Sequence, residues 1–146
     1  MTIKMSHVVA VTGAAGYIGT RLLQFLESDP SVSKIVSIDQ NIPSGHFRKL
    51  EAYRVDINQK LDQIFKINDV TVVVHLVFIV DPIHDEEKMY RINVEGTRNV
   101  FEASEKSGVK RILMASSGTA YGAQRRSCTP PMGFHCCMGK LRRVKL

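Results

Sequence analysis

The stretch Thr12-Gly13-Ala14-Ala15-Gly16-Tyr17-Ile18-Gly19 places three glycines at intervals of three residues. It follows a short apolar run, residues 7–12, and leads into residues 17–27, whose apolar side chains recur at helical spacing. Between a buried strand and a helix, Gly13 permits a tight turn, Gly16 lets the backbone approach a ligand, and Gly19 lets the helix pack closely. The free N–H groups of the first helical turn then point at an anion, so this loop predicts a diphosphate site.

An acidic residue ends the next apolar run, residues 34–39, because Asp39 lies twenty residues after Gly19. A carboxylate at this place accepts hydrogen bonds from ribose hydroxyls and repels a 2′-phosphate. The following residues, Gln40 and Asn41, bring no cation that would hold such a phosphate. The sequence therefore predicts a dinucleotide site and favours NAD over NADP. The alternative is an ordinary strand–helix turn with a surface aspartate.

Segments with strand-like and helix-like periods alternate along the chain. Strands are expected at residues 7–12, 34–39, 52–57, 70–77 and 111–116, and helices at residues 17–27, 59–66 and 85–107, with a loop at residues 40–50. The side chains expected on the buried face of the first helix are Ile18, Leu22, Phe25 and Leu26. This alternation predicts an α/β fold, a Rossmann-type doubly wound parallel sheet with strand order 3-2-1-4-5. The alternation ends after Gly122, so we expect a sheet that is incomplete on its C-terminal side.

The composition changes at the same point, which divides the chain into a domain at residues 1–122 and an irregular tail at residues 123–146. The tail holds all three cysteines and six of the 20 basic residues but no acidic residue, so it carries the whole net charge of +6. A basic tail is able to bind nucleic acid, but an unfolded end without a role is the simpler interpretation. Two of its cysteines, Cys136 and Cys137, are adjacent, which does not match zinc-ligand spacing, so we expect no metal site.

The chain has no pattern typical of membrane insertion. Its longest apolar run, residues 70–80, spans eleven residues and includes Thr71 and His75, whereas a membrane helix needs about 20. The first residues lack the apolar block and the cleavage site of a signal peptide. We therefore expect a cytoplasmic protein without a membrane partner, in which the cysteines are free thiols.

The glycine motif at residues 12–19 resembles that of short-chain dehydrogenases/reductases, in the extended or atypical branch related to NAD-dependent epimerases/dehydratases. Later stretches match motifs of the same family in order and spacing: Val74-His75-Leu76, Asn93-Val94-Glu95-Gly96-Thr97-Arg98-Asn99, and Ser116-Ser117-Gly118-Thr119-Ala120-Tyr121-Gly122. The resemblance covers residues 7–122. It implies an NAD-binding domain and an inherited chemistry of hydride transfer on a sugar nucleotide or a similar hydroxyl or carbonyl substrate.

The resemblance also implies which residues contact the cofactor. They are Gly13, Ala14, Ala15, Gly16, Tyr17, Ile18, Gly19, Asp39, Asp56, Ile57, Leu76 and Val77. In the family, the pair at Asp56 and Ile57 contacts the adenine ring through a carboxylate and a backbone amide, although Asp56 could also be a simple strand-end cap. We expect His75 to be a hydrogen-bonded core residue rather than a proton donor, and Asn93 and Gly96 to be architectural.

Members of the family that do redox chemistry use a serine or threonine together with a Tyr-x-x-x-Lys pair, because hydride transfer must be matched by proton transfer at an oxygen. Ser117 aligns with the serine and is the sole catalytic candidate. None of the four tyrosines (Tyr17, Tyr53, Tyr90 and Tyr121) is followed by lysine at the fourth place. Tyr121 is followed there by Arg125, a poor substitute for lysine. We therefore expect no turnover from this chain alone.

Three functions remain open on the sequence. The chain is the cofactor-binding half of an epimerase, dehydratase or reductase; or an NAD-binding sensor without catalysis; or an inactive fragment made by a frameshift, an altered splice or a premature end. The substrate is not indicated. A sheet that ends at the fifth strand is expected to expose an edge and to self-associate through it.

Overall fold

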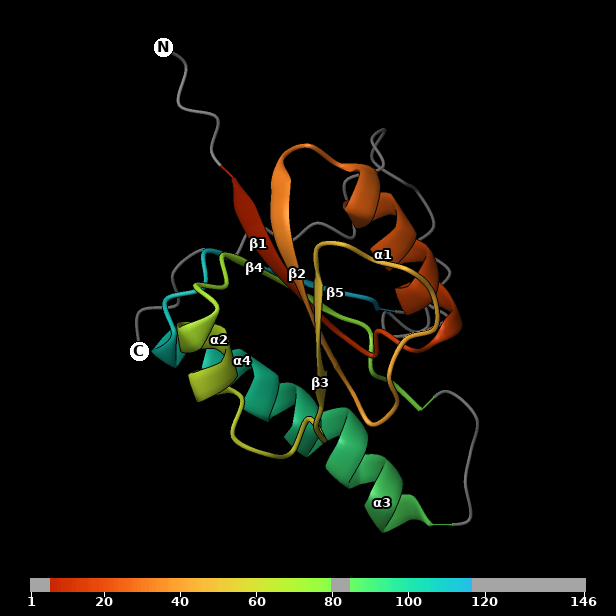
Figure 1. Ribbon diagram of the computed structural model, residues 1–146. Coiled ribbons are helices and arrows are strands. Elements are labelled where there is room, and N and C mark those ends of the chain that lie inside the picture. The colour runs from red at the N-terminus through yellow and green to blue at the C-terminus, as the bar shows by residue number, and fades with distance from the viewer. Residues whose placement is uncertain (1–5, 80–84, 117–146) are drawn as a thin grey trace, which may run out of the picture.

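The computed structural model describes residues 6–79 and 85–116, which form one parallel five-stranded sheet with helices on both faces (Figure 1). The strand order is β3-β2-β1-β4-β5, as predicted. The elements are β1 (His7–Thr12), α1 (Tyr17–Ser28), β2 (Val32–Asp39), β3 (Leu50–Arg54), α2 (Asp62–Ile67), β4 (Val72–His75), α3 (Glu86–Tyr90), the π-helical turn η1 (Arg91–Gly96), α4 (Thr97–Lys106) and β5 (Arg111–Met114). Of the described helices, none is long and apolar enough to cross a bilayer.

Two apolar cores cover the two faces of the sheet, because side chains alternate between the faces along each strand. Under α2 and α4, the core contains residues such as Val36, Phe65 and Val100. Under α1, it contains residues such as Val11, Leu23 and Ile35. The central strands are buried on both faces, which explains their nearly continuous apolar runs.

Helix α1 packs through a face that lies one residue away from the predicted one. Its buried residues are Gly19, Leu23 and Leu26, whereas Ile18 and Phe25 are 63% and 66% exposed. The prediction was right for Leu26 and partly right for Leu22, which is half-buried against the same core, and it was wrong for Ile18 and Phe25. The physical reason is the close contact at Gly19, where an added Cβ would lie 2.3 Å from the Gly13 carbonyl oxygen. That contact fixes the rotation of the helix, and a glycine adds nothing to an apolar periodicity.

The third and fourth strands end earlier than predicted. β3 pairs with β2 from Leu50 to Arg54, where Arg54 lies opposite Asp39, instead of spanning residues 52–57. β4 ends at His75 rather than at residue 77. Residues 55–57 and 76–79 therefore leave the sheet at its carboxyl edge as loops, and they extend the surface next to the glycine loop.

The predicted helix at residues 85–107 is present, but it contains a wide turn. Asp85 caps it by accepting a hydrogen bond from the Lys88 amide at 2.9 Å, and Gly108, with φ of 72°, follows its last turn. Between these ends, Arg91–Gly96 is π-helical. Such turns occur mostly inside α-helices and frequently at functional sites, and they leave no mark in a 3.6-residue period.

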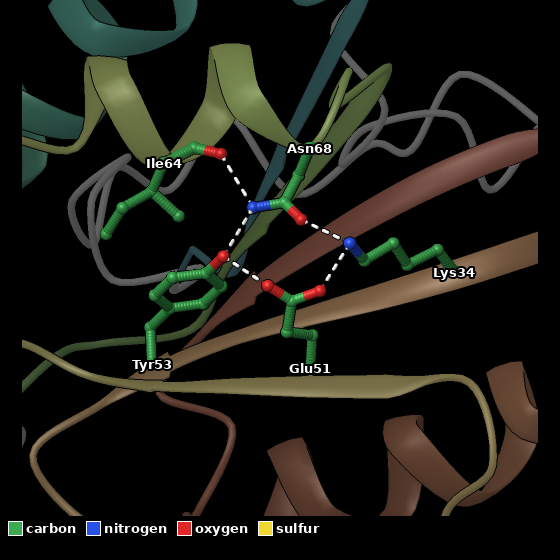
Figure 2. Close-up of polar contacts among 5 residues, drawn as sticks. All are labelled: Lys34, Glu51, Tyr53, Ile64 and Asn68. Carbon is green, nitrogen blue, oxygen red and sulfur yellow. Dashed lines mark hydrogen bonds and ion pairs between the residues drawn. The ribbon is translucent and has the colours of Figure 1, made fainter.

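A polar network fastens the end of α2 to the sheet (Figure 2). Lys34 of β2 pairs with Glu51 of β3 and donates to the Asn68 side chain, while Tyr53 donates to Glu51. The Asn68 amide in turn donates to the Tyr53 hydroxyl and the Ile64 carbonyl, both at 2.9 Å. The hydrogen bond from Lys34 lowers the pKa of Glu51. Since Asn68 precedes β4, this network lies toward the amino end of that strand, away from the loops at the carboxyl edge.

Candidate functional site

A cavity of about 310 Å³ opens at the carboxyl ends of the strands, where the chain leaves β1, β2 and β4. Its lining residues are Gly13, Gly16, Asp39, Gln40, Asn41, Val55, Asp56, Ile57, Leu76, Val77, Phe78, Ile79 and Ile92. In doubly wound sheets, ligands bind at this edge, where successive connections turn to opposite faces. A larger hollow of about 800 Å³ lies beside Glu27, away from this edge. The Glu27 carboxylate there already accepts hydrogen bonds from the backbone amides of Arg48 and Lys49.

The glycine loop forms one wall of the cavity. Gly13 has φ of 74°, its amide donates to the Ile38 carbonyl at 3.0 Å, and an added Cβ would lie 3.0 Å from the Val77 amide nitrogen. Gly16 is the N-cap residue of α1 and offers no side-chain oxygen to the helix. The first backbone bond of α1 runs from Thr20 to Gly16. The N–H groups before it lie at the positive end of the helix dipole, which is suited to an anion.

Asp39 lies beside this loop at the end of β2. Its Oδ2 accepts a hydrogen bond from the Ala15 amide at 3.0 Å, and its Oδ1 accepts from the Asn41 amide at 2.9 Å. The acid that the sequence singled out therefore contacts the loop that the sequence singled out. The two features belong to one site, 24 residues apart in the chain.

Asp56 and Ile57 form the opposite wall. Asp56 accepts from the Asn58 amide at 2.8 Å and from the Gln40 side chain at 2.7 Å. The pKa of Asp56 is lowered, mainly by the hydrogen bond from the Asn58 backbone, so the carboxylate is charged at neutral pH. Asp56 thus caps its own loop and also lines the cavity, so the two interpretations of this residue are compatible.

The third wall is residues 76–79. Leu76 donates its amide to the Thr12 carbonyl at 3.1 Å, and the Asn93 side chain contacts both the amide and the carbonyl of Ile79, at 2.8 and 3.0 Å. Asn93 therefore ties down a neighbouring backbone, as predicted. Phe78 is 61% exposed at the rim of the cavity.

The predicted cofactor residues fall into three groups. Those lining the cavity are Gly13, Gly16, Asp39, Asp56, Ile57, Leu76 and Val77. The second group contacts the loop without lining the cavity: Ala15 donates its amide to Asp39, and Gly19 packs against Gly13 and Ala14. The third group is exposed and lies outside the lining, with exposed fractions of 82% for Tyr17 and 63% for Ile18. Ser117, the catalytic candidate, lies outside the described residues. Lining residues that the sequence did not single out are Gln40, Asn41, Val55, Phe78, Ile79 and Ile92.

His75 lies behind the cavity and is buried, with 2% of its surface exposed. Thr97 donates its hydroxyl hydrogen to the Asn93 carbonyl at 2.7 Å, so it accepts from His75 Nε2 at 2.9 Å. The other ring nitrogen, Nδ1, then accepts from the Thr12 hydroxyl at 2.6 Å. Burial lowers the pKa of His75 to about 4. His75 is therefore a neutral, hydrogen-bonded core residue.

A separate question is whether the structure offers a metal site. Within the described residues, no group of three histidine, cysteine or acidic side chains is placed to hold a metal.

Solved structures share this architecture. The Bordetella bronchiseptica enzyme WbmG, solved in complex with NAD, matches with a TM-score of 0.71 and 25% identity over 84% of this chain and 41% of its own. MoeE5, solved in complex with UDP-glucuronic acid and NAD, matches with a TM-score of 0.69 and 31% identity over 80% of this chain and 38% of its own.

The relatives found by sequence comparison include sugar 4-epimerases. An undecaprenol-linked N-acetylglucosamine 4-epimerase of Escherichia coli O157:H7 is 34% identical over 84% of this chain and 36% of its own length. The UDP-glucose 4-epimerase of Bacillus subtilis is 30% identical over 82% of this chain and 39% of its own. The chain thus spans between a third and two fifths of these relatives. Residues 9–134 match the model of the NAD dependent epimerase/dehydratase family, and the chain belongs to that family.

Proposed function

We propose that the cavity binds NAD, with the diphosphate at the start of α1, the adenosine ribose on Asp39 and the adenine between Asp56 and Ile57. The observation that carries this proposal is the hydrogen bond between the Asp39 carboxylate and the Ala15 amide, which unites the glycine loop and the ribose-binding acid in one site. The residues fit the cofactor, because Gly16 keeps open the space that a side chain would fill: an added Cβ would meet just one atom within 4 Å, the Gly13 oxygen at 3.3 Å.

Titration of the full chain with NAD tests the proposal directly. A ligand that binds only the folded state raises its stability, so saturating NAD should raise the melting temperature and calorimetry should show one site. An unchanged melting temperature together with no heat of binding would refute the proposed site.

The chemistry that NAD supplies when bound is hydride transfer, and we propose that this chain provides the cofactor-binding part of a sugar-nucleotide epimerase or a related enzyme. The names of the relatives support this substrate class. Asp39 and the loop orient the dinucleotide, and residues 76–79 close the third wall. A sensor that binds NAD without catalysis is the second candidate, because the glycine loop and Asp39 would hold the cofactor in the same way in either protein. An assay for hydride transfer on a UDP-sugar separates the two, and turnover that Ser117→Ala abolishes would favour the enzyme.

Asp39→Asn is expected to weaken NAD binding about tenfold and to narrow the preference for NAD over NADP. The change keeps the size of the side chain but removes its negative charge and leaves one acceptor oxygen for the Ala15 and Asn41 amides. In the parent chain, the negative charge strengthens the hydrogen bond from ribose and repels a 2′-phosphate. Isothermal titration with both dinucleotides measures the two effects. The matched control, Asp56→Asn, removes a charge at the other wall and should leave the ratio of the two affinities unchanged. An unchanged ratio in Asp39→Asn would contradict the ribose assignment.

We propose that the chain self-associates through the edge of β5 that no other described strand pairs with. β5 is the last strand of the described sheet, and its Leu113 and Met114 are 39% and 45% exposed. Sedimentation velocity should show association that grows with protein concentration and weakens in Leu113→Lys, because a charge disfavours burial of this surface. Ile67→Lys is the control: Ile67 is 78% exposed on α2, away from β5. A monomer at all concentrations would contradict the proposal.

A further inference from the structure

Asn99 on α4 links this helix to the adenine side of the cavity. Its side-chain amide donates to the carbonyl of Gln59 at 2.7 Å and to the carbonyl of Ile57. Both carbonyls belong to the loop that follows β3 and carries Asp56, and the two residues lie 40 and 42 positions before Asn99 in the chain. An amide nitrogen has two hydrogens, so this one side chain uses its full donor capacity on a single loop.

The same loop packs against the helix one turn earlier. Ile57 is 5% exposed, and a Cβ added at Gly96 would lie 2.3 Å from its Cδ1 atom. Gly96 therefore lets the Ile57 side chain lie directly against the helix backbone. Asn93, at the start of this region, holds Ile79 on the other wall. The continuous helix formed by η1 and α4 thus contacts two of the three walls of the cavity, each through one asparagine.

We propose that Asn99 is a positioning residue for the adenosine end of the cofactor, acting by fixing the loop that carries Asp56 and Ile57. The proposal rests on the proposed function of the cavity. Its physical basis is the pair of hydrogen bonds from Asn99 to the carbonyls of Ile57 and Gln59, one and three residues after Asp56. The contact between Ile57 and Gly96 adds to it, because it leaves the loop little room. When the two bonds are lost, the loop is no longer fastened to α4. Asp56 keeps its hydrogen bonds with Asn58 and Gln40, but its position relative to the rest of the cavity varies with the loop. The cost falls on ligands that contain adenosine.

The variant Asn99→Leu in the full chain tests this, because leucine has a similar size and donates no hydrogen bond. Calorimetry with NAD and with AMP is expected to show affinities about tenfold weaker than in the parent chain, which matches the net loss of one to two hydrogen bonds. Binding of nicotinamide mononucleotide, followed by saturation-transfer NMR, should not change. A general loss of structure would weaken all three ligands, so this split is the readout that a merely structural role would not produce.

Asn68→Leu is the matched control. Asn68 also donates two amide hydrogens, to the Tyr53 hydroxyl and the Ile64 carbonyl, but it belongs to the network near the amino end of β4 (Figure 2). This variant should lower the melting temperature and leave the affinities for NAD and AMP unchanged. If Asn99→Leu does not fold, Asn99→Ser takes its place. Serine is small and polar, and its short hydroxyl has one hydrogen, so it cannot make both hydrogen bonds.

The outcomes are distinguishable. A parent chain that binds neither NAD nor AMP overturns the proposed function and the role of Asn99 with it. A parent chain that binds both, with an Asn99 variant that binds AMP equally well, overturns the role of Asn99 alone. If the Asn99 variant loses affinity for AMP and for nicotinamide mononucleotide equally, the role of Asn99 is also overturned. A loss of affinity confined to NAD and AMP supports that role.

Discussion

The variant Gly16→Val is expected to fold with a modest loss of stability, because its Cβ would lie 3.3 Å from the Gly13 oxygen and valine is a poor N-cap residue. It should bind NAD at least about 100-fold more weakly, the equivalent of two charge-assisted hydrogen bonds. Gly16 has φ of −70° and ψ of 170°, an extended conformation that valine adopts readily. An added Cβ would approach a single atom within 4 Å, the Gly13 oxygen at 3.3 Å. The methyl groups of valine would therefore occupy the open side of the loop, where we place the diphosphate.

Gly19→Ala is the contrasting variant, because it should damage the fold instead. Its Cβ would lie 2.3 Å from the Gly13 oxygen and 2.7 Å from the Ala14 Cα, and both are backbone atoms that cannot turn aside. Overpacking of this kind costs about 1–3 kcal/mol of unfolding free energy. Urea unfolding and NAD titration of both variants separate the two roles. Parental NAD affinity in Gly16→Val would contradict the placement of the diphosphate at this loop.

The strand order was predictable because it follows from few rules. Strands that alternate with helices must run parallel, right-handed crossovers restrict their order, and the glycine motif marks the first strand. The rotation of α1 was not predictable from apolar spacing. The deciding contact is made by Gly19, which has no side chain. The buried residues are therefore Gly19, Leu23 and Leu26, and Ile18 and Phe25 face solvent.

The sequence predicted the lining of the cavity best at residues whose role follows from their own chemistry and position in the motif. Gly13, Gly16 and Asp39 each have a local chemical reason, and all three line the cavity. Residues whose role depends on a distant partner carried no such signal: Gln40 reaches Asp56 across 16 residues, and Asn99 reaches Ile57 across 42. From the sequence alone, an asparagine on a helix is expected to lie at the surface. Only the fold shows that a loop lies next to Asn99 and accepts its hydrogen bonds.

Folding stability is expected to fall by about 2 kcal/mol between pH 7.5 and pH 5 because of His75 alone. Burial lowers the pKa of this ring from 6.5 to about 4 in the folded protein. Between these two values the unfolded chain binds a proton that the folded chain does not, so acidification favours unfolding. The contribution is fully present above pH 6.5 and decreases as the pH falls toward 4.

The hydrogen bonds explain why the folded protein resists this proton. His75 Nδ1 accepts from Thr12 while Nε2 donates to Thr97, whose own hydrogen goes to the Asn93 carbonyl. A protonated ring would carry hydrogens on both nitrogens, so the Thr12 hydroxyl would lose its acceptor. The charge would also lie in a site that is 2% exposed, where it is poorly solvated.

Urea unfolding followed by circular dichroism at pH 7.5, 6.5, 5.5 and 5 measures the effect, with His75→Asn as the comparison. The variant should be less stable at pH 7.5, because it loses hydrogen bonds of the ring, but its stability should change much less across this range. Stopping at pH 5 keeps the contributions of Glu51 and Asp56 small, because their pKa values are lowered in the fold and their ordinary values of 4.5 and 3.8 both lie below pH 5. Equal slopes in the parent and the variant would show that the folded ring takes up the proton as readily as the unfolded one, with Nδ1 then donating to the Thr12 hydroxyl.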